Sequence, residues 1–162
     1  MSVPPHAVQL NEANDFLKKH PEVQFVDLLI ADMNGVVRGK RIERASLHKV
    51  YQRGINLPAS LFALDINGST VESSGLGLDI GDSDRVCYPI PDTLCNEPWQ
   101  KRPTAQLLMT MHEMEGEAFF ADPRAVLQQV VKKFDALGLT ICAAFELEFY
   151  LIERNADPNT PL

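Results

Sequence analysis

Two glutamates spaced two residues apart are the clearest candidates for chemistry in this sequence. Glu146 and Glu148 lie in an apolar run, residues 143–151, whose side chains alternate with period two. That pattern predicts a strand with both carboxylates on one face, roughly 7 Å apart. The spacing is too long for a shared proton but suits two divalent cations, each held by one carboxylate and by oxygens from elsewhere. The alternative, a half-buried strand whose outer glutamates are solvated, stays open on spacing alone.

The preceding elements would have to position this strand. Residues 105–111 predict a strand, 114–116 a turn and 118–121 the return of a hairpin. Asp122 and Pro123 then form a clear helix start, and apolar residues recur at helical spacing up to a stop at Gly138. We expect this helix to pack on the core without a chemical role, and residues 139–152 to return as the glutamate strand. Cys142 would be a small core residue in that strand.

The first hundred residues predict a second group of elements, and the domain boundary is expected near Pro103. A helix at 11–20 precedes an apolar strand at 24–31, a hairpin turn at Asn34-Gly35 and a return strand at 36–42. A helix at 45–53 ends at Gly54. Residues 56–82 are the least regular part, with a possible strand at 60–66, and 85–90 is extended. The pattern alone indicates an α+β fold.

Composition narrows the class of protein. The chain has 162 residues, 45% hydrophobic and 23% charged, with a formal net charge of -7. No basic patch is visible, which argues against a nucleic-acid partner, and no apolar run approaches ~20 residues, which argues against a membrane span. The N-terminal residues lack the features of a signal peptide. Three cysteines, Cys87, Cys95 and Cys142, match no zinc spacing and favour a reduced, cytoplasmic location.

Four stretches, taken in order, resemble the glutamine synthetase family. They are VDLLIADMNG at 26–35, RGKRI at 38–42, LPASLFALD at 57–65 and FELEF at 145–149. The nearer likeness is to the branch that includes the γ-glutamylputrescine synthetases, and it covers the chain from about Val23 to Glu153. It implies an N-terminal tail and short helix (1–22), a β-grasp-like N-terminal domain (23–103) and the beginning of a glutamine-synthetase-type catalytic α/β domain (104–162), with the rest of that domain beyond Leu162.

The resemblance also implies a reaction and its metal ions. ATP would phosphorylate the side-chain carboxylate of glutamate, and an amine would displace the phosphate, with Mg²⁺ or Mn²⁺ neutralising charge. By the resemblance, Glu146 would serve the cation between the nucleotide phosphates and Glu148 the cation near the amino-acid substrate. The remaining ligands and the nucleotide site would lie outside this chain, so the 162 residues are expected to be inactive alone. A homo-oligomer, typically a dodecamer of two hexameric rings, is implied.

A departure from the family pattern bears on the amine. Ammonia-using members carry an Asp-Gly-Ser-Ser run in a loop that reaches into the neighbouring subunit's active site, and its aspartate helps bind ammonium and remove a proton. Here Pro58, Ala59 and Ser60 stand in that loop, with Pro58 at the aspartate position. The missing carboxylate favours a larger amine, such as a polyamine. Asp65 or Glu72 could instead supply the carboxylate, which would keep ammonia as substrate. A non-catalytic module that binds or regulates a full-length ligase is the other alternative.

Overall fold

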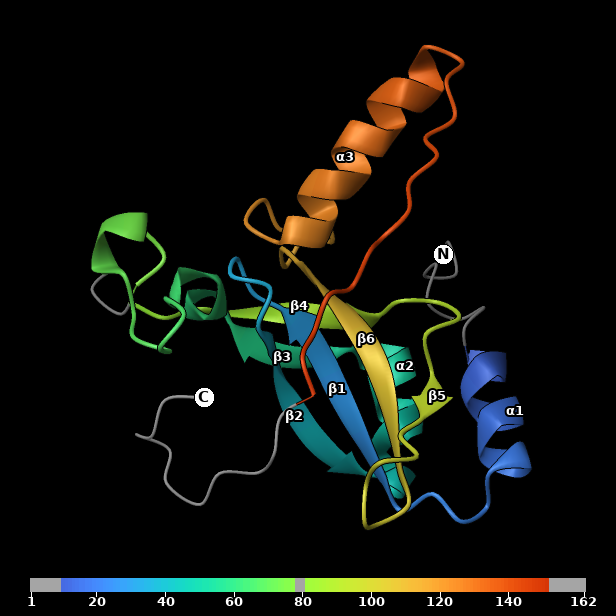
Figure 1. The fold of residues 1–162 in the computed structure, drawn as a ribbon. Coiled ribbons are helices and arrows are strands. Elements are labelled where there is room, and N and C mark those ends of the chain that lie inside the picture. The colour runs from blue at the N-terminus through green and yellow to red at the C-terminus, as the bar shows by residue number, and fades with distance from the viewer. Residues whose placement is uncertain (1–9, 78–80, 152–162) are drawn as a thin grey trace.

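A mixed sheet organises the part of the chain that the computed structural model describes, residues 10–77 and 81–151. Its strands run in the order β2-β1-β6-β4-β3, with β5 beside β6 (Figure 1). β1 and β6 are parallel, and every other pairing is antiparallel. The elements in chain order are α1 Leu10–Lys19, β1 Phe25–Ala31, β2 Val37–Glu43, η2 Arg44–Ser46, α2 Leu47–Arg53, β3 Ile55–Pro58, η3 Ala59–Ala63, η4 Glu72–Ser74, β4 Asp84–Pro89, β5 Cys95–Asn96, β6 Thr104–His112 and α3 Pro123–Ala136.

The β1–β2 hairpin confirms the predicted turn at Asn34-Gly35. Gly35 has φ 74°, a conformation that glycine adopts without a steric penalty, and the Asp32 amide donates to the Val36 carbonyl at 2.9 Å. The turn sets a register in which Phe25 lies opposite Glu43 and Ala31 opposite Val37. Alternate residues of β1 are therefore buried along one face of the sheet.

The core lies between that face and two helices. Buried side chains of α1 and α2 contact buried side chains of the three central strands in one cluster, and the two helices also contact each other. Its members from these elements are Ala13 and Leu17 from α1, Leu47, Val50 and Tyr51 from α2, Val26, Leu28 and Ile30 from β1, Cys87 from β4, and Ala105, Leu107, Met109 and Met111 from β6. Each fully buried aliphatic side chain of this kind contributes about 1.5–3 kcal/mol.

The predicted glutamate strand is absent. Residues 140–151 form neither helix nor strand, and Phe145 is 93% exposed, so the expected strand over 139–152 is wrong for the described residues up to Leu151. An extended segment becomes a strand only when a neighbour satisfies its backbone groups, and the described residues provide none. Cys142 is correspondingly exposed rather than buried.

Helix α3 forms as predicted but does not pack on the core. The Asp122 side chain caps its first turn, and Gly138 follows its end with φ 72°. Of its residues only Ala125 is buried, and Leu127 is 61% exposed. In Figure 1 the helix stands away from the sheet. The expectation of a core-packing helix is therefore wrong here, because its apolar face meets no opposing surface in the described chain.

Two smaller predictions also differ from the structure. Residues 60–66 do not form a strand, because the strand of this region is β3 and the chain turns into η3 directly after Pro58. Residues 118–121 form a single bridge, between His112 and Ala118, and no return strand. Of the tails expected at 1–10 and 155–162, only Leu10 is described, and it begins α1; residues 1–9 and 152–162 lie outside the described residues.

Strand β6 is central to the sheet although it lies beyond the expected domain boundary. It begins at Thr104, pairs with β1 on one side and with β4 on the other, and carries four core residues. The boundary near Pro103 remains a prediction. Within the described ranges no helix has the length and apolar character needed to cross a membrane.

Candidate functional site

The predicted metal ligands lie outside the sheet. Glu146 and Glu148 are exposed and belong to the segment without regular structure that comes after α3. Carboxylate oxygens are donors that Mg²⁺ and Mn²⁺ prefer, so their chemistry fits such ions. Across residues 10–77 and 81–151, however, no three His, Cys, Asp or Glu side chains gather closely enough to hold a metal ion. The two glutamates thus fit as partial ligands, and their role remains a prediction.

The predicted substrate loop, Pro58 to Ser60, is hydrogen-bonded to the residues that directly precede β4. Pro58 ends β3, and Ala59 and Ser60 begin η3 with both residues buried. The Ala59 amide donates to the Ser83 carbonyl, and the Ser60 amide donates to Asp82 Oδ1, each at 3.2 Å. This segment is held by its backbone, and its three side chains carry no carboxylate. Its role toward a substrate remains a prediction.

The two carboxylates that could replace the missing aspartate lie farther along the same connection. Asp65 Oδ1 accepts from the amides of Asn67 and Ser69 at 2.9 and 2.8 Å, so the side chain stabilises its own turn. Glu72 is exposed in the short helix η4. Replacement of the aspartate by one of them remains a prediction.

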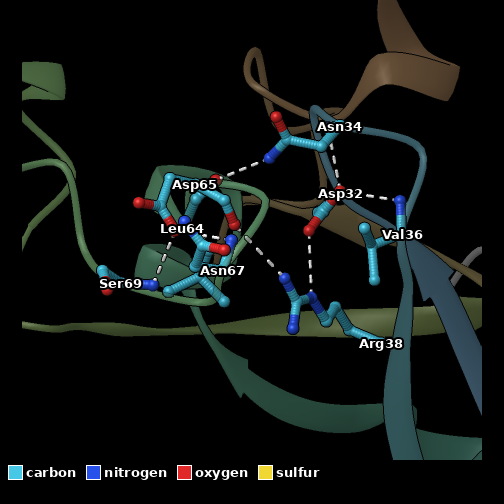
Figure 2. A network of polar contacts seen from close by, with 8 residues as sticks. All are labelled: Asp32, Asn34, Val36, Arg38, Leu64, Asp65, Asn67 and Ser69. Atoms are coloured by element: carbon cyan, nitrogen blue, oxygen red, sulfur yellow. Dashed lines mark hydrogen bonds and ion pairs between the residues drawn. The ribbon is translucent and has the colours of Figure 1, made fainter. Parts of the chain in front are cut away.

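A buried carboxylate that is absent from the sequence-based predictions organises this end of the sheet. Asp32 is 2% exposed and lies at the start of the β1–β2 turn. Its Oδ1 accepts from the amides of Asn34 and Val36 at 2.8 and 2.9 Å, and its Oδ2 accepts from Arg38 Nε at 2.9 Å (Figure 2). Three donors therefore converge on one carboxylate.

The same hairpin holds the connection after η3. Asn34 Nδ2 donates to the Leu64 carbonyl at 2.8 Å, and an Arg38 guanidinium nitrogen lies 3.5 Å from the Asp65 carbonyl (Figure 2). Thus Asp32 orients Asn34 and Arg38, and these two residues hold residues 64–65. The predicted substrate loop is thus fixed by Asp82 and Ser83, and the connection that follows it is fixed by this hairpin.

The electrostatics assign Asp32 a structural role. Burial alone would raise its pKa, but the hydrogen bonds from Arg38, Asn34 and Val36 outweigh burial and hold the pKa below its usual value. An ionised carboxylate whose oxygens are already engaged by three donors is a poor general base. Cys87 is likewise unsuited to chemistry, since burial, and second the charge of Asp122, raise the pKa of its thiol to about 12.

The sequence contains a local signal for Asp32. An aspartate two residues before Asn-Gly is a frequent start of a side-chain-stabilised turn, and an arginine on the return strand can reach it. Asp122 was predicted as a helix cap, and its Oδ1 accepts from the Arg124 amide at 2.9 Å. Its second oxygen also accepts from the Thr110 hydroxyl and the Met111 amide, both at 2.8 Å, which ties α3 to β6.

Comparison with known proteins connects these features to one family. Residues 120–162 match the family model described as glutamine synthetase, catalytic domain. The chain is 40% identical over 146 residues to the γ-glutamylputrescine synthetase of Escherichia coli (strain K12), covering 90% of this chain and 31% of that protein. It is 32% identical to a glutamate–isopropylamine ligase of a Pseudomonas species, covering 89% of this chain and 31% of that protein.

Solved structures agree at the level of the fold. One described as a novel glutamine synthase homolog matches with a TM-score of 0.62 and 21% identity, covering 71% of this chain and 27% of that chain. The chain thus spans about a third of the length of the curated relatives that it matches.

Proposed function

This chain belongs to the glutamine synthetase family, and from that premise we propose that it is part of an ATP-dependent ligase that joins glutamate to an amine larger than ammonia. The observation that supports this most is the 40% identity, over nine-tenths of the chain, to a γ-glutamylputrescine synthetase. In the proposed reaction ATP phosphorylates the glutamate side-chain carboxylate, and the amine then displaces the phosphate.

Glu146 and Glu148 are the proposed metal ligands of this chain. Mg²⁺ or Mn²⁺ held there would neutralise the charge of the phosphates. The exposure of both carboxylates is compatible with ligands that come from more than one segment. The nucleotide site and the other ligands would lie in sequence outside these 162 residues, so the chain alone is proposed to be inactive.

The identity of the amine is proposed from Pro58. A proline at this position provides no carboxylate to attract ammonium or to remove its proton. Ala59 and Ser60 are buried, and their side chains are small and uncharged, so they provide no carboxylate either. The proposed substrate is therefore a primary amine with an alkyl chain, and putrescine and isopropylamine are the first to test.

The architecture and setting proposed for the whole protein rest on the same premise. The strand order β2-β1-β6-β4-β3, with α1 and α2 on one face, supports a β-grasp-type N-terminal domain. We further propose a homo-oligomer, a dodecamer of two hexameric rings in the complete enzyme, and a cytoplasmic location.

Two alternatives stay distinct from this proposal. An ammonia-using glutamine synthetase would need Asp65 or Glu72 to replace the missing aspartate. A non-catalytic module would bind or regulate a full-length ligase and would not need Glu146 and Glu148 at all.

The deciding experiment is the intact mass of the polypeptide from its native source, followed by an ADP-release assay. A ligase of the relatives' length would have roughly 470 residues and a mass of roughly 50 kDa, whereas the chain alone has 18.1 kDa. For the long form we expect ADP release with ATP, glutamate, Mg²⁺ and putrescine, and much less with ammonium. A mass of 18.1 kDa would favour the non-catalytic module.

Matched variants make the assay specific. Glu146→Gln and Glu148→Gln should each lower kcat at least a hundredfold, while Glu115→Gln, in an exposed turn, should leave it unchanged. Pro58→Asp should raise kcat/KM for ammonium relative to putrescine. Equal use of ammonium by the unaltered enzyme would instead support the ammonia-using alternative.

A further inference from the structure

Two turns of this chain share a local sequence and a set of hydrogen bonds. Residues 32–35 (Asp-Met-Asn-Gly) and 65–68 (Asp-Ile-Asn-Gly) contain the two places where an asparagine directly precedes a glycine. In each turn the aspartate Oδ1 accepts from the asparagine amide, at 2.8 Å in the first and 2.9 Å in the second. The glycine amide donates to the aspartate carbonyl, at 3.1 and 3.0 Å, and the glycines have φ 74° and 86°. The backbones of the two turns are therefore closely matched.

An asparagine followed by glycine can lose its side-chain amide without an enzyme. The glycine nitrogen gives up its proton and attacks the asparagine Cγ, so a C–N bond forms and the side-chain nitrogen, once protonated, leaves as ammonia. Water then opens the succinimide ring at one of its two carbonyls, which yields aspartate or isoaspartate. One water is consumed and one ammonia is released. Glycine favours the attack because it has no side chain to obstruct the approach of Cγ to its nitrogen.

The side chain of Asn34 is anchored in the first turn. Its Nδ2 donates to the Leu64 carbonyl at 2.8 Å, and this bond restricts the rotation that brings Cγ to the Gly35 nitrogen (Figure 2). The rest of the turn is also held, because Asp32 is buried and paired with Arg38. Loss of one such hydrogen bond before the attack slows the reaction by about three- to tenfold.

The side chain of Asn67 has no such anchor. Asn67 is exposed, and across residues 10–77 and 81–151 its side-chain amide forms no hydrogen bond. Only its backbone amide is engaged, by Asp65 Oδ1 (Figure 2). Where the first turn joins the strands β1 and β2, the second is flanked by a single bridge between Leu64 and Thr70. The second turn thus has the same reactive sequence with fewer restraints on the asparagine.

We propose that Asn67 is a site of spontaneous deamidation, and that the bond from Asn34 to the Leu64 carbonyl protects Asn34 from the same reaction. The modification needs water and no cofactor. It is independent of the ligase reaction proposed above, so failure of either proposal leaves the other untouched.

Deamidation at Asn67 would alter the connection that follows the predicted substrate loop. A Cβ built at Gly68 would lie 3.6 Å from Arg38 Nη1, so the new carboxylate appears one residue from a position beside that guanidinium. Isoaspartate also inserts a methylene group into the backbone between the amides of Asn67 and Ser69. Asp65 Oδ1 accepts from both of these amides and cannot keep both bonds in their present geometry.

The test is incubation of the folded 162-residue chain in mildly alkaline buffer, followed by tryptic peptide mapping with mass spectrometry. Trypsin places the two asparagines in different peptides, residues 20–38 and 54–85. We expect Asn67 to deamidate at least about threefold faster than Asn34, after subtraction of a sample digested at time zero. A methyltransferase specific for isoaspartate, supplied with a labelled methyl donor, should label peptide 54–85 before peptide 20–38.

The same chain unfolded in urea is the control for local sequence. Both asparagines should deamidate there at similar rates, because the bond from Asn34 to the Leu64 carbonyl is absent. In the folded chain Asn56 is an internal control, since it lies in β3, precedes Leu57 and should stay unmodified. Asn67→Gln should abolish labelling of peptide 54–85, because the longer side chain would have to close a six-membered ring.

Three results would overturn the proposal. The first is a ratio of the two rates that is the same in the folded and in the unfolded chain. The second is an unmodified Asn67 in the folded chain after a time in which the unfolded chain has reacted. The third is an Asn67→Gln variant, folded by circular dichroism, whose peptide 54–85 still acquires isoaspartate.

Discussion

The Asp32 carboxylate helps to position a segment that lies far from it in the sequence, residues 64–65. Its oxygens hold the turn amides and Arg38, and through Asn34 and Arg38 the hairpin reaches the carbonyls of Leu64 and Asp65. Removing its charge would leave Arg38, which is half-buried, without its ionic partner. The loss would therefore extend to the connection after the predicted substrate loop.

We expect Asp32→Asn to lower the free energy of unfolding by about 2–4 kcal/mol, because a buried charged hydrogen-bond network loses its acceptor. Urea unfolding of the 162-residue chain measures it. Asp27→Asn is the matched control, since the Asp27–Arg41 pair joins the same two strands but its Arg41 side chain is 46% exposed, so its loss should matter less. Equal effects of the two variants would contradict the role assigned to Asp32.

The pH dependence of this contribution has a definite sign. Because the folded-state pKa of Asp32 is held below its unfolded value, its stabilisation is present above that unfolded value, about 3.9. It is lost as the pH falls through the folded pKa. The stability difference between the wild type and Asp32→Asn should thus be constant near neutral pH and shrink below about pH 4. A difference that grew toward acid would refute this assignment.

At the scale of elements, the β1–β2 hairpin depends on a close approach at Gly39. A Cβ built there would lie 1.9 Å from the Leu28 carbonyl oxygen, far inside any contact that real atoms make. Gly39 lies opposite Leu29 in the register, and Leu28 is a core residue. Any side chain at 39 must therefore push the two strands apart.

Gly39→Ala should consequently destabilise the chain by about 1–3 kcal/mol or more, as overpacking against backbone does. Thermal unfolding followed by circular dichroism provides the measurement. Lys40→Ala, an exposed change one residue along the same strand, should shift the midpoint little. A neutral Gly39→Ala would mean that the hairpin is wider than described.

At the scale of the whole molecule, the fold of the first hundred residues depends on β6, which lies later in the chain. Truncation after Pro103 removes Leu107, Met109 and Met111 from the core, each contributing about 1.5–3 kcal/mol, while a small domain has only about 5–15 kcal/mol in total. We expect residues 1–103 to show no cooperative thermal transition.

Truncation after Gly138 is the matched control. It retains the whole sheet, and the described residues that it removes, 139–151, are all exposed. It should unfold cooperatively close to the midpoint of the full chain. A cooperative transition in residues 1–103 would instead support a domain boundary at Pro103.

Local signals explain why some of this molecule could be predicted and the rest could not. The Asn34-Gly35 turn, the stop at Gly54 and the cap at Asp122 depend on nearby residues, and all three are confirmed. The alternation of residues 143–151 predicts only that a strand formed there would have two different faces. Whether a partner strand lies beside it depends on distant parts of the chain, which the local sequence does not reveal. The carbonyls that Asn34 and Arg38 contact lie about 30 residues farther along the chain, a separation that no spacing rule reveals.

The parallel pairing of β1 with β6 imposes an order on synthesis. Phe25 pairs with Thr104, so β1 cannot meet its central partner until some 80 more residues have been translated. At about 5–20 residues per second that interval is roughly 4–16 s, long compared with hairpin formation, which takes microseconds. During it α1 and α2 are already synthesised, but the edge of β1 that later pairs with β6 keeps its backbone groups unpaired. The ribosome-bound chain therefore passes through a period in which a chaperone has an apolar strand to hold.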